Sequence, residues 1–256
     1  MRQLMVCIDV LIFIFVVAVS QAVELSGQEV VTKCFALYRQ TPSECEQTKV
    51  TVTPDGGKPT GKAFTRWILF NPAGEDKVVV KFNEPAFDKG LGLLIWRHAS
   101  GDEQWLKMPS FDKIRKIAVA DQSKYFGGTD ITFEDARQLI GERTQDFDYK
   151  ILSSENGWKI EALPKTGIKT GYGKRIFFVR PDFACTAIEY YDSRGELLKK
   201  QSNGEIKIQA NGIWRANKVT INNRSLKRIT ELMVTGRSFD SVDANVFTQD
   251  FLLRKD

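Results

Sequence analysis

Apolar and polar residues alternate along most of the chain beyond residue 46, with the period of strands that bury one face. The stretches that show this alternation or a short apolar run are 48–53, 62–70, 77–82, 91–97, 104–108, 113–119, 147–152, 158–163, 175–179, 184–191, 196–201, 205–209, 214–222 and 227–234. Turn pairs separate several of them, including Asn156-Gly157, Asn203-Gly204 and Asn211-Gly212. Because strands do not alternate with helices, the pattern predicts one large antiparallel sheet, open or curled, with helices on one face.

Helical periodicity precedes the first strand. Ser26 and Glu29 have the spacing of a capping box, and apolar residues including Cys34 then recur every three or four positions. This pattern predicts an amphipathic helix that ends near residue 40. A short helical piece is also expected within 239–254.

A second helix is predicted in the middle of the chain, where Thr132 and Asp135 form another capping box and Gly141 is a natural end. The loop before it, Tyr125-Phe126-Gly127-Gly128, combines two aromatic rings with glycines that permit unusual backbone angles. We expect this loop to shift relative to the sheet and its rings to cover an apolar interior. The alternative is that Phe126 is a fixed core residue.

Alternation within the strands assigns side chains to two faces. Lys81 is expected to face water, and Arg66 interrupts the apolar face of its own strand. The residues predicted to point inward are Phe64, Ile68, Phe70, Val80, Phe82, Trp158 and Ile160. An ordinary packed core and a lined cavity would both give this pattern, so periodicity leaves the two interpretations open.

The first 22 residues have the layout of a secretory signal. Arg2 supplies the positive start, Asp9 interrupts the apolar part, and Ser20-Gln21-Ala22 offers small residues for cleavage. The apolar run over 10–19 is shorter than the roughly 20 residues that span a bilayer. We therefore expect cleavage near Ala22 and an exported, soluble mature chain that forms a single domain over residues 23–256.

Three cysteines remain after this signal, namely Cys34, Cys45 and Cys185. In an oxidising compartment, Cys34 and Cys45 are candidates for a disulfide across the turn at Pro42. Three separate buried thiols are the alternative. The chain lacks a Cys-x-x-Cys motif, so no metal site is predicted.

Candidate catalytic groups are few. His98 is the one histidine, and the sequence marks no partners for a triad around it, so we predict a surface or turn position. Asp130, Glu134 and Asp135 gather at the start of the predicted helix, which favours negative charge, and capping explains them more simply than a catalytic carboxylate pair. The chain is therefore expected not to be an enzyme and to need no cofactor.

The formal net charge of +5 is modest for 256 residues, so nucleic acid is not an expected partner. A weak attraction to anionic lipid headgroups fits this balance better. The basic residues that cluster in the central stretch are Lys113, Arg115, Lys116 and Lys124.

The stretch 104–135 carries the most specific pattern. It reads Gln-Trp-Leu-Lys-Met-Pro at 104–109, Lys-Ile-Arg-Lys-Ile at 113–117 and Phe-Gly-Gly-Thr-Asp-Ile-Thr-Phe-Glu-Asp at 126–135. These segments resemble the strand pair, loop and helix of the outer-membrane lipoprotein-sorting protein family, within the LolA-like superfamily of periplasmic lipid carriers. Ile131 departs from the family pattern, which has an aromatic residue there. Weaker similarities extend to 247–249 and so cover nearly the whole mature chain.

This resemblance implies a mainly β fold with a few helices: an incomplete antiparallel β-barrel, or curled sheet, with helices packed on its concave side. It implies a monomeric periplasmic protein that binds lipid or lipoprotein acyl chains in a hydrophobic cavity and shuttles them towards the outer membrane. Candidate lipid-binding residues are Phe64, Ile68, Phe70, Val80, Phe82, Trp158, Ile160, Tyr125 and Phe126. Lys113, Arg115, Lys116 and Lys124 are candidates for contact with a headgroup or a partner at the cavity rim.

The resemblance also implies an inner-membrane partner, an exporter of the resistance-nodulation-division type, and transient contact with a membrane. Two other functions remain open. The protein is alternatively a module that senses a lipid or lipoprotein together with such an exporter. A hydrolase whose site the sequence does not mark is the least favoured function.

Overall fold

The computed structural model describes residues 24–72, 75–111, 113–137 and 141–254. The predicted signal, residues 1–22, lies outside the described residues. The strands are β1 Ser43–Pro54, β2 Thr60–Leu69, β3 Lys77–Glu84, β4 Gly92–His98, β5 Gly101–Lys107, β6 Ile114–Lys116, β7 Phe147–Ser153, β8 Trp158–Pro164, β9 Lys174–Val179, β10 Cys185–Tyr191, β11 Leu197–Ile208, β12 Trp214–Asn223 and β13 Arg228–Ser238. The α-helices are α1 Gly27–Tyr38, α2 Phe133–Ala136 and α3 Gln249–Leu253, and 3-10 turns include η1 Val119–Asp121, η3 Thr144–Asp146 and η4 Ala244–Phe247. Within the described part of the chain, no helix is long and apolar enough to cross a membrane.

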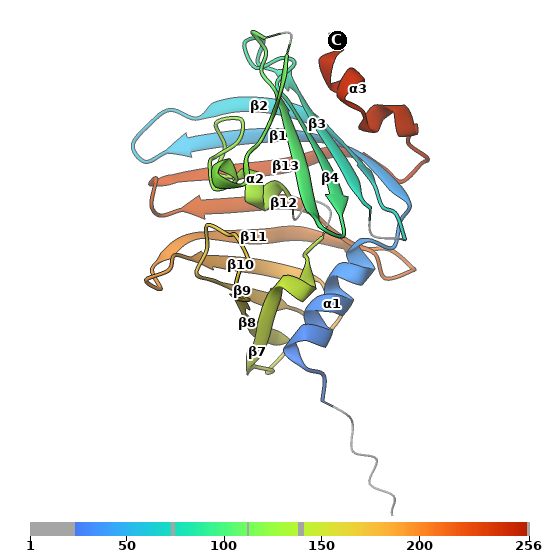
Figure 1. The fold of residues 1–256 in the computed structure, drawn as a ribbon. Coiled ribbons are helices and arrows are strands. Elements are labelled where there is room, and N and C mark those ends of the chain that lie inside the picture. Colours follow the sequence, from blue (N-terminus) through green and yellow to red (C-terminus); the bar gives the residue numbers. More distant parts are fainter. Residues whose placement is uncertain (1–23, 73–74, 112, 138–140, 255–256) are drawn as a thin grey trace, which may run out of the picture.

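All thirteen strands belong to one antiparallel sheet, in the order β6-β5-β4-β3-β2-β1-β13-β12-β11-β10-β9-β8-β7. Two chain-sequential halves, β1–β6 and β7–β13, join where β1 pairs with β13, for example at Val50 and Leu232. Figure 1 shows that the sheet curls around a concave face. The edge strands β6 and β7 are not paired with each other in the described structure, so the predicted curled but incomplete barrel is confirmed.

The strand order determines which parts of the sheet the chain joins between β6 and β7. Because these strands form opposite edges of the sheet, residues 117–146 connect one edge to the other. We call these residues the crossing segment; positions 138–140 within it are not described. Its short helix α2 lies over the concave face, between the two halves of the sheet (Figure 1). The most specific motif in the sequence therefore covers the interior of the fold.

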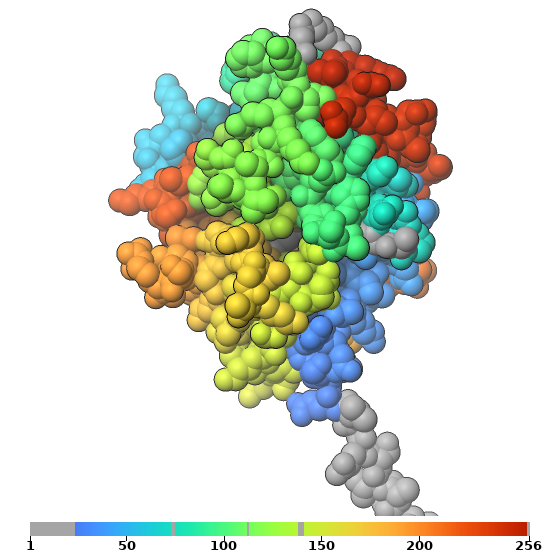
Figure 2. Space-filling model, in the orientation of Figure 1, coloured from blue at the N-terminus to red at the C-terminus, as the bar shows by residue number. Residues whose placement is uncertain are grey.

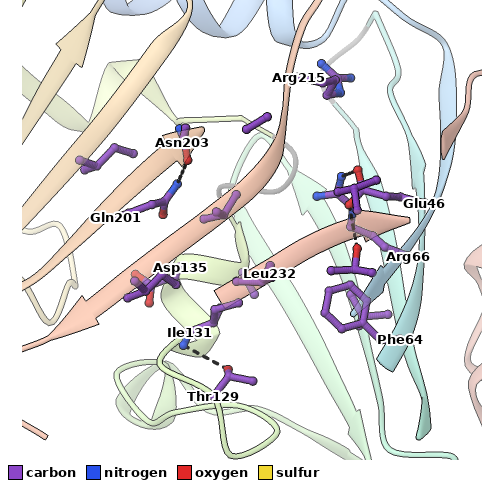
Figure 3. A pocket seen from close by; sticks show the side chains of 18 of the residues that line it. Glu46, Phe64, Arg66, Thr129, Ile131, Asp135, Gln201, Asn203, Arg215 and Leu232 are labelled. Carbon is purple, nitrogen blue, oxygen red and sulfur yellow. Dashed lines mark hydrogen bonds and ion pairs between the residues drawn. The ribbon is translucent and has the colours of Figure 1, made fainter. Parts of the chain in front are cut away.

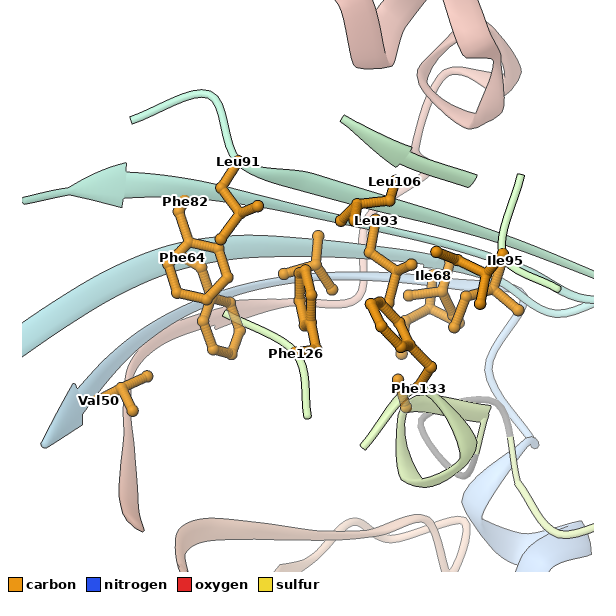
Figure 4. Packing of buried hydrophobic residues seen from close by; sticks show 14 of the residues in the cluster. Val50, Phe64, Ile68, Phe82, Leu91, Leu93, Ile95, Leu106, Phe126 and Phe133 are labelled. Carbon is orange, nitrogen blue, oxygen red and sulfur yellow. The ribbon is translucent and has the colours of Figure 1, made fainter. Parts of the chain in front are cut away.

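Two apolar cores lie on the concave side. The first joins strands β1–β5 to the crossing segment through Phe126 and Phe133, as Figure 4 shows. The second packs α1 against β7–β10 through buried residues such as Val30 and Phe35. The predicted capping box at the start of α1 is confirmed, because Ser26 accepts a hydrogen bond from the Glu29 backbone and the Glu29 carboxylate accepts one from the Ser26 backbone.

The opposite face of the sheet is also covered, which the sequence did not predict. Val79 and Leu94 pack there against Phe247 and Leu252, from η4 and α3. The prediction that Lys81 faces water is therefore wrong. Its side chain is buried beneath the C-terminal segment, and its ammonium group donates a 3.0 Å hydrogen bond to the Arg254 carbonyl.

Two predicted strand boundaries also need correction. Asn203-Gly204 is not a turn: β11 runs through it without a break, and Gly204 pairs with Lys218 of β12. The stretch 113–119 forms only the three-residue strand β6, after which the chain turns towards the concave face. The predicted turn at Asn156-Gly157 is confirmed between β7 and β8, where both residues have positive φ.

Candidate functional site

A cavity of about 150 Å³ lies between the concave face of the sheet and the crossing segment (Figure 3). Its walls come from both cores: Phe82 and Phe126 belong to the first, and Ile188 and Trp214 to the second. The apolar lining side chains include Phe35, Phe64, Val80, Phe82, Leu93, Phe126, Ile131, Ile188, Val219, Ile221 and Leu232. The cavity is thus the space that the two halves of the sheet leave unfilled between their cores.

The crossing segment covers this interior and is held there by buried polar contacts. Figure 2 shows the segment, in green to yellow-green, and the β8–β9 connection, in yellow, lying together over this face. Glu134 joins the two, because its carboxylate accepts 2.7 Å hydrogen bonds from the Gly171 backbone and from Arg175 of β9. Glu134 does lie in the first turn of α2, as expected, but its side chain binds the β8–β9 connection and Arg175 of β9 and does not cap the helix.

Asp130 makes the second attachment. Its fully buried carboxylate accepts hydrogen bonds from Asn223 at 2.7 Å, Arg228 at 2.7 Å and Thr230 at 2.6 Å. These partners lie on β12 and β13, close to the junction of the two halves. Asp130 is thus a fixed anchor of the crossing segment, and helix capping does not explain it either.

Asp135 makes the third attachment, and for this residue the predicted capping box is confirmed. Its carboxylate also accepts a 2.8 Å hydrogen bond from Tyr172 and lies against the ammonium group of Lys199 on β11. Burial alone would raise the pKa of Asp135, but Lys199 and the hydrogen bonds outweigh burial and hold the pKa below its usual range. Burial in the same region raises the pKa of Tyr172.

The aromatic loop is compact. Gly127 and Gly128 have φ angles of +62° and +68°, and a side chain at Gly127 would place its Cβ 2.7 Å from the Phe82 ring. Phe126 is buried, with its ring centroid 5.6 Å from those of both Phe82 and Phe133. In this conformation Phe126 is a packed core residue that also lines the cavity.

Only some of the nine candidate lipid-binding residues line the cavity. Phe64, Val80, Phe82 and Phe126 line the cavity. Ile68 and Phe70 pack within the first core, Trp158 and Ile160 within the second, and Tyr125 is about one-third exposed. The sequence reasoning missed the β12–β13 part of the lining, namely Val219, Ile221 and Leu232. Their strands were predicted, and the alternation within them was the signal that could have found these residues.

The four candidate rim residues lie near an edge of the sheet. Lys113, Arg115 and Lys116 belong to or border β6, and their side chains are exposed, as is that of Lys124. Lys124 pairs with Asp121 at 2.6 Å, and Arg115 lies 3.7 Å from the same carboxylate. None of the four belongs to the described lining of the cavity.

The predicted Cys34–Cys45 disulfide is absent from the described structure, where all three cysteines are free thiols. Cys34 points from α1 into the second core and packs with Cys185, whereas Cys45 lies on β1 opposite Trp67. Burial raises the pKa of Cys34 well above its ordinary value and that of Cys185 to about 12. The described structure thus has separate thiols, of which Cys34 and Cys185 are buried and Cys45 is partly exposed.

The single histidine has one acidic neighbour, Glu103, among the described residues. His98 is the last residue of β4, half-buried, and its Nε2 lies 3.3 Å from Glu103. Among the described residues, no three His, Cys, Asp or Glu side chains are arranged to hold a metal ion.

The solved structures that share this fold include three with known sources. A domain described as an outer membrane lipoprotein-sorting protein from Vibrio parahaemolyticus aligns with a TM-score of 0.81 and 22% identity, over 89% of this chain and 98% of that one. A DUF1329 family protein from Desulfovibrio piger aligns with a TM-score of 0.81 and 20% identity, over 88% and 97%. A LolA superfamily protein from Nitrosomonas europaea aligns with a TM-score of 0.69 and 16% identity, over 89% and 100%. At these identities the likeness establishes the fold.

No curated protein matches the sequence. A family model of the DUF1329-like type, with the description "Uncharacterized protein", matches residues 74–254. That range contains most of the sheet, the crossing segment and the C-terminal helix α3. Because the match covers well over half of the chain, the protein belongs to this DUF1329-like family, and its fold is that of the LolA superfamily.

Proposed function

We propose that the protein is a non-catalytic periplasmic carrier that binds an acyl chain of a lipid or lipoprotein in the cavity beneath the crossing segment. The observation that carries this proposal is the cavity itself, a mainly apolar space bounded by two separate cores. Protein interiors normally close such spaces, because unfilled volume forfeits packing contacts. An acyl chain would restore those contacts and would itself be removed from water, at about 0.8 kcal/mol for each CH₂ group.

The size of the cavity sets a condition on loading. Engineered cavities of roughly 150 Å³ hold a molecule the size of benzene, and the volume here is about 150 Å³. The closed conformation therefore accommodates only part of a long acyl chain. Loading of a whole chain requires the crossing segment to move outward or the two halves of the sheet to separate.

The proposal also covers how the carrier receives its cargo and where it takes it. The carrier would receive its cargo from an inner-membrane exporter of the resistance-nodulation-division type and move it towards the outer membrane after export directed by residues 1–22. Lys113, Arg115, Lys116 and Lys124 are exposed and are the proposed contacts with an acidic partner or with headgroups during transient membrane contact. The proposed carrier is a monomer.

Native mass spectrometry of protein purified from its own host tests this proposal. The expected result is a mass equal to the mature chain plus one lipid or lipidated peptide, which is lost on extraction with organic solvent. Protein that carries no extra mass under gentle ionisation, and takes up none when mixed with host lipids, would contradict the carrier function. Chemical turnover of the bound lipid would indicate the hydrolase instead.

A further inference from the structure

One wall of the cavity is strongly charged, although the rest of its lining is mainly apolar. We call this wall the arginine cluster, which consists of Arg66, Arg215, Arg237, Glu44 and Glu46. Its members come from four strands, β1, β2, β12 and β13, on both sides of the junction between the two halves. All except Glu44 line the cavity, and Figure 3 shows Glu46, Arg66 and Arg215 on the same side of it.

The ion pairs of the cluster are close. Arg215 donates to Glu44 at 2.7 Å, and Arg237 donates to Glu46 at 2.7 Å. Arg66 bridges the two carboxylates, at 3.3 Å from Glu44 and 2.9 Å from Glu46. Three guanidinium groups thus share two carboxylates, which leaves a formal charge of +1.

This excess charge is buried. Arg66 is 6% exposed and Arg215 is 2% exposed, while Glu44 is fully buried. Removing an uncompensated charge from water costs several kcal/mol even after relaxation of its surroundings. The other two charged lining residues, Asp135 and Lys199, neutralise each other. The charged lining of the cavity therefore lacks one negative charge.

Arg66 also has unused hydrogen-bonding capacity. Its buried Nε has no hydrogen-bond partner among the described residues. Arg66 lies two positions after Phe64 on the same face of β2, so the two side chains are separated by roughly 7 Å along the strand. A ligand whose apolar chain lies along Phe64 would therefore place its head beside this guanidinium group.

We propose that the cavity selects an amphiphile whose head carries one negative charge on oxygen, a carboxylate or a phosphate, and that the arginine cluster binds this head. The inference rests on the proposed carrier function, because the apolar lining must hold the chain. Guanidinium groups suit both heads, since their planar N–H forks match the spacing of carboxylate and phosphate oxygens. The cluster then acts as the polar end of an otherwise apolar site.

The test uses delipidated full-length mature protein and four probes with the same twelve-carbon chain. Dodecanoate, the singly charged phosphodiester dodecyl methyl phosphate, dodecanol and dodecyltrimethylammonium compete with the neutral fluorescent probe N-phenyl-1-naphthylamine. Dodecanoate or dodecyl methyl phosphate should displace the probe at least about tenfold more effectively than dodecanol, the scale of one hydrogen bond to a charged group. The cationic probe should compete least well. The stronger of the two anions identifies the head as a fatty-acid carboxylate or a phospholipid phosphate.

Two variants locate the effect. Arg66→Met should remove the advantage of the anions over dodecanol, whereas Arg115→Met, at an exposed arginine outside the cavity lining, should keep that advantage. Displacement by both anions no better than by dodecanol in the wild type would overturn the inference while leaving the carrier function intact. Failure of every probe to bind would overturn both. The wild-type comparison decides the matter even if Arg66→Met does not fold.

Discussion

Arg228 donates a hydrogen bond from Nε to the Asp130 carboxylate at 2.7 Å, and this ion pair joins the crossing segment to β13. Asp130 is fully buried, so protein groups take the place of water around its carboxylate. The pair flanks the cavity, because Thr129 and Ile131 on either side of Asp130 belong to its lining. The covering of the cavity is therefore an anchored structure, and movement of the crossing segment must break buried polar contacts.

Asp130→Asn should destabilise the protein by about 3 kcal/mol, because loss of one partner from a buried ion pair leaves the other uncompensated. Urea unfolding followed by circular dichroism measures this change. Glu231→Gln is the matched control, since Glu231 and its partner Lys218 are both about two-fifths exposed and the expected loss is below about 1 kcal/mol. Equal losses in the two variants would show that Asp130 is not an anchor.

The lowered pKa of Asp135 predicts a dependence of stability on pH. An aspartate in the unfolded chain has a pKa of about 3.9, and the pKa of Asp135 in the folded protein is lower. Such a carboxylate stabilises the folded state fully at pH values above the unfolded pKa. This stabilisation is lost as the pH falls through the folded pKa. Asp135→Asn should therefore be less stable than the wild type at pH 7, and its stability should fall less steeply below about pH 4. Parallel stability curves for the two proteins over this acid range would contradict the prediction.

Phe126→Ala should lower the free energy of unfolding by about 3 kcal/mol or more, because it removes a ring packed between Phe82 and Phe133. Phe87→Ala provides the comparison, since Phe87 is 76% exposed and its loss should change stability by less than about 0.5 kcal/mol. A Phe126→Ala protein with unchanged stability and weaker cargo retention would favour the shifting loop that the sequence suggested.

The free thiols give a direct chemical prediction. In the mature protein, a maleimide reagent under denaturing, non-reducing conditions should label Cys34, Cys45 and Cys185. Under native conditions Cys45 should react first, because it is partly exposed whereas Cys34 and Cys185 are buried; burial raises the pKa of all three thiols. Labelling of Cys185 alone after denaturation would instead restore the Cys34–Cys45 disulfide.

Local patterns in the sequence predicted local structure correctly. The capping boxes at Ser26 and Thr132 involve residues three positions apart, and both are present. The curled antiparallel sheet followed from alternation, turn pairs and the family resemblance. Features that depend on distant residues were missed: Lys81 is buried because a segment about 170 residues further along covers it, at Arg254.

At the candidate site, too, local features were predicted from the sequence and contacts between distant residues were missed. Phe64, Val80 and Phe82 were identified as inward because alternation reports which face a side chain occupies. Alternation does not report whether an inward side chain meets another or an empty space, so Ile160 could not be separated from the lining. The arginine cluster was invisible for a further reason, since Arg215 and Glu44 are 171 positions apart.

We propose that lipid occupies the cavity on the concave face. Substitutions at two neighbouring residues of β13 test this proposal most directly. Leu232 lines the cavity, whereas Met233 is 37% exposed and is absent from the described lining. Native mass spectrometry should detect one bound lipid per folded molecule in the wild type and in Met233→Trp, and little or none in Leu232→Trp, whose larger ring fills the space. Full lipid occupancy in folded Leu232→Trp would contradict the account.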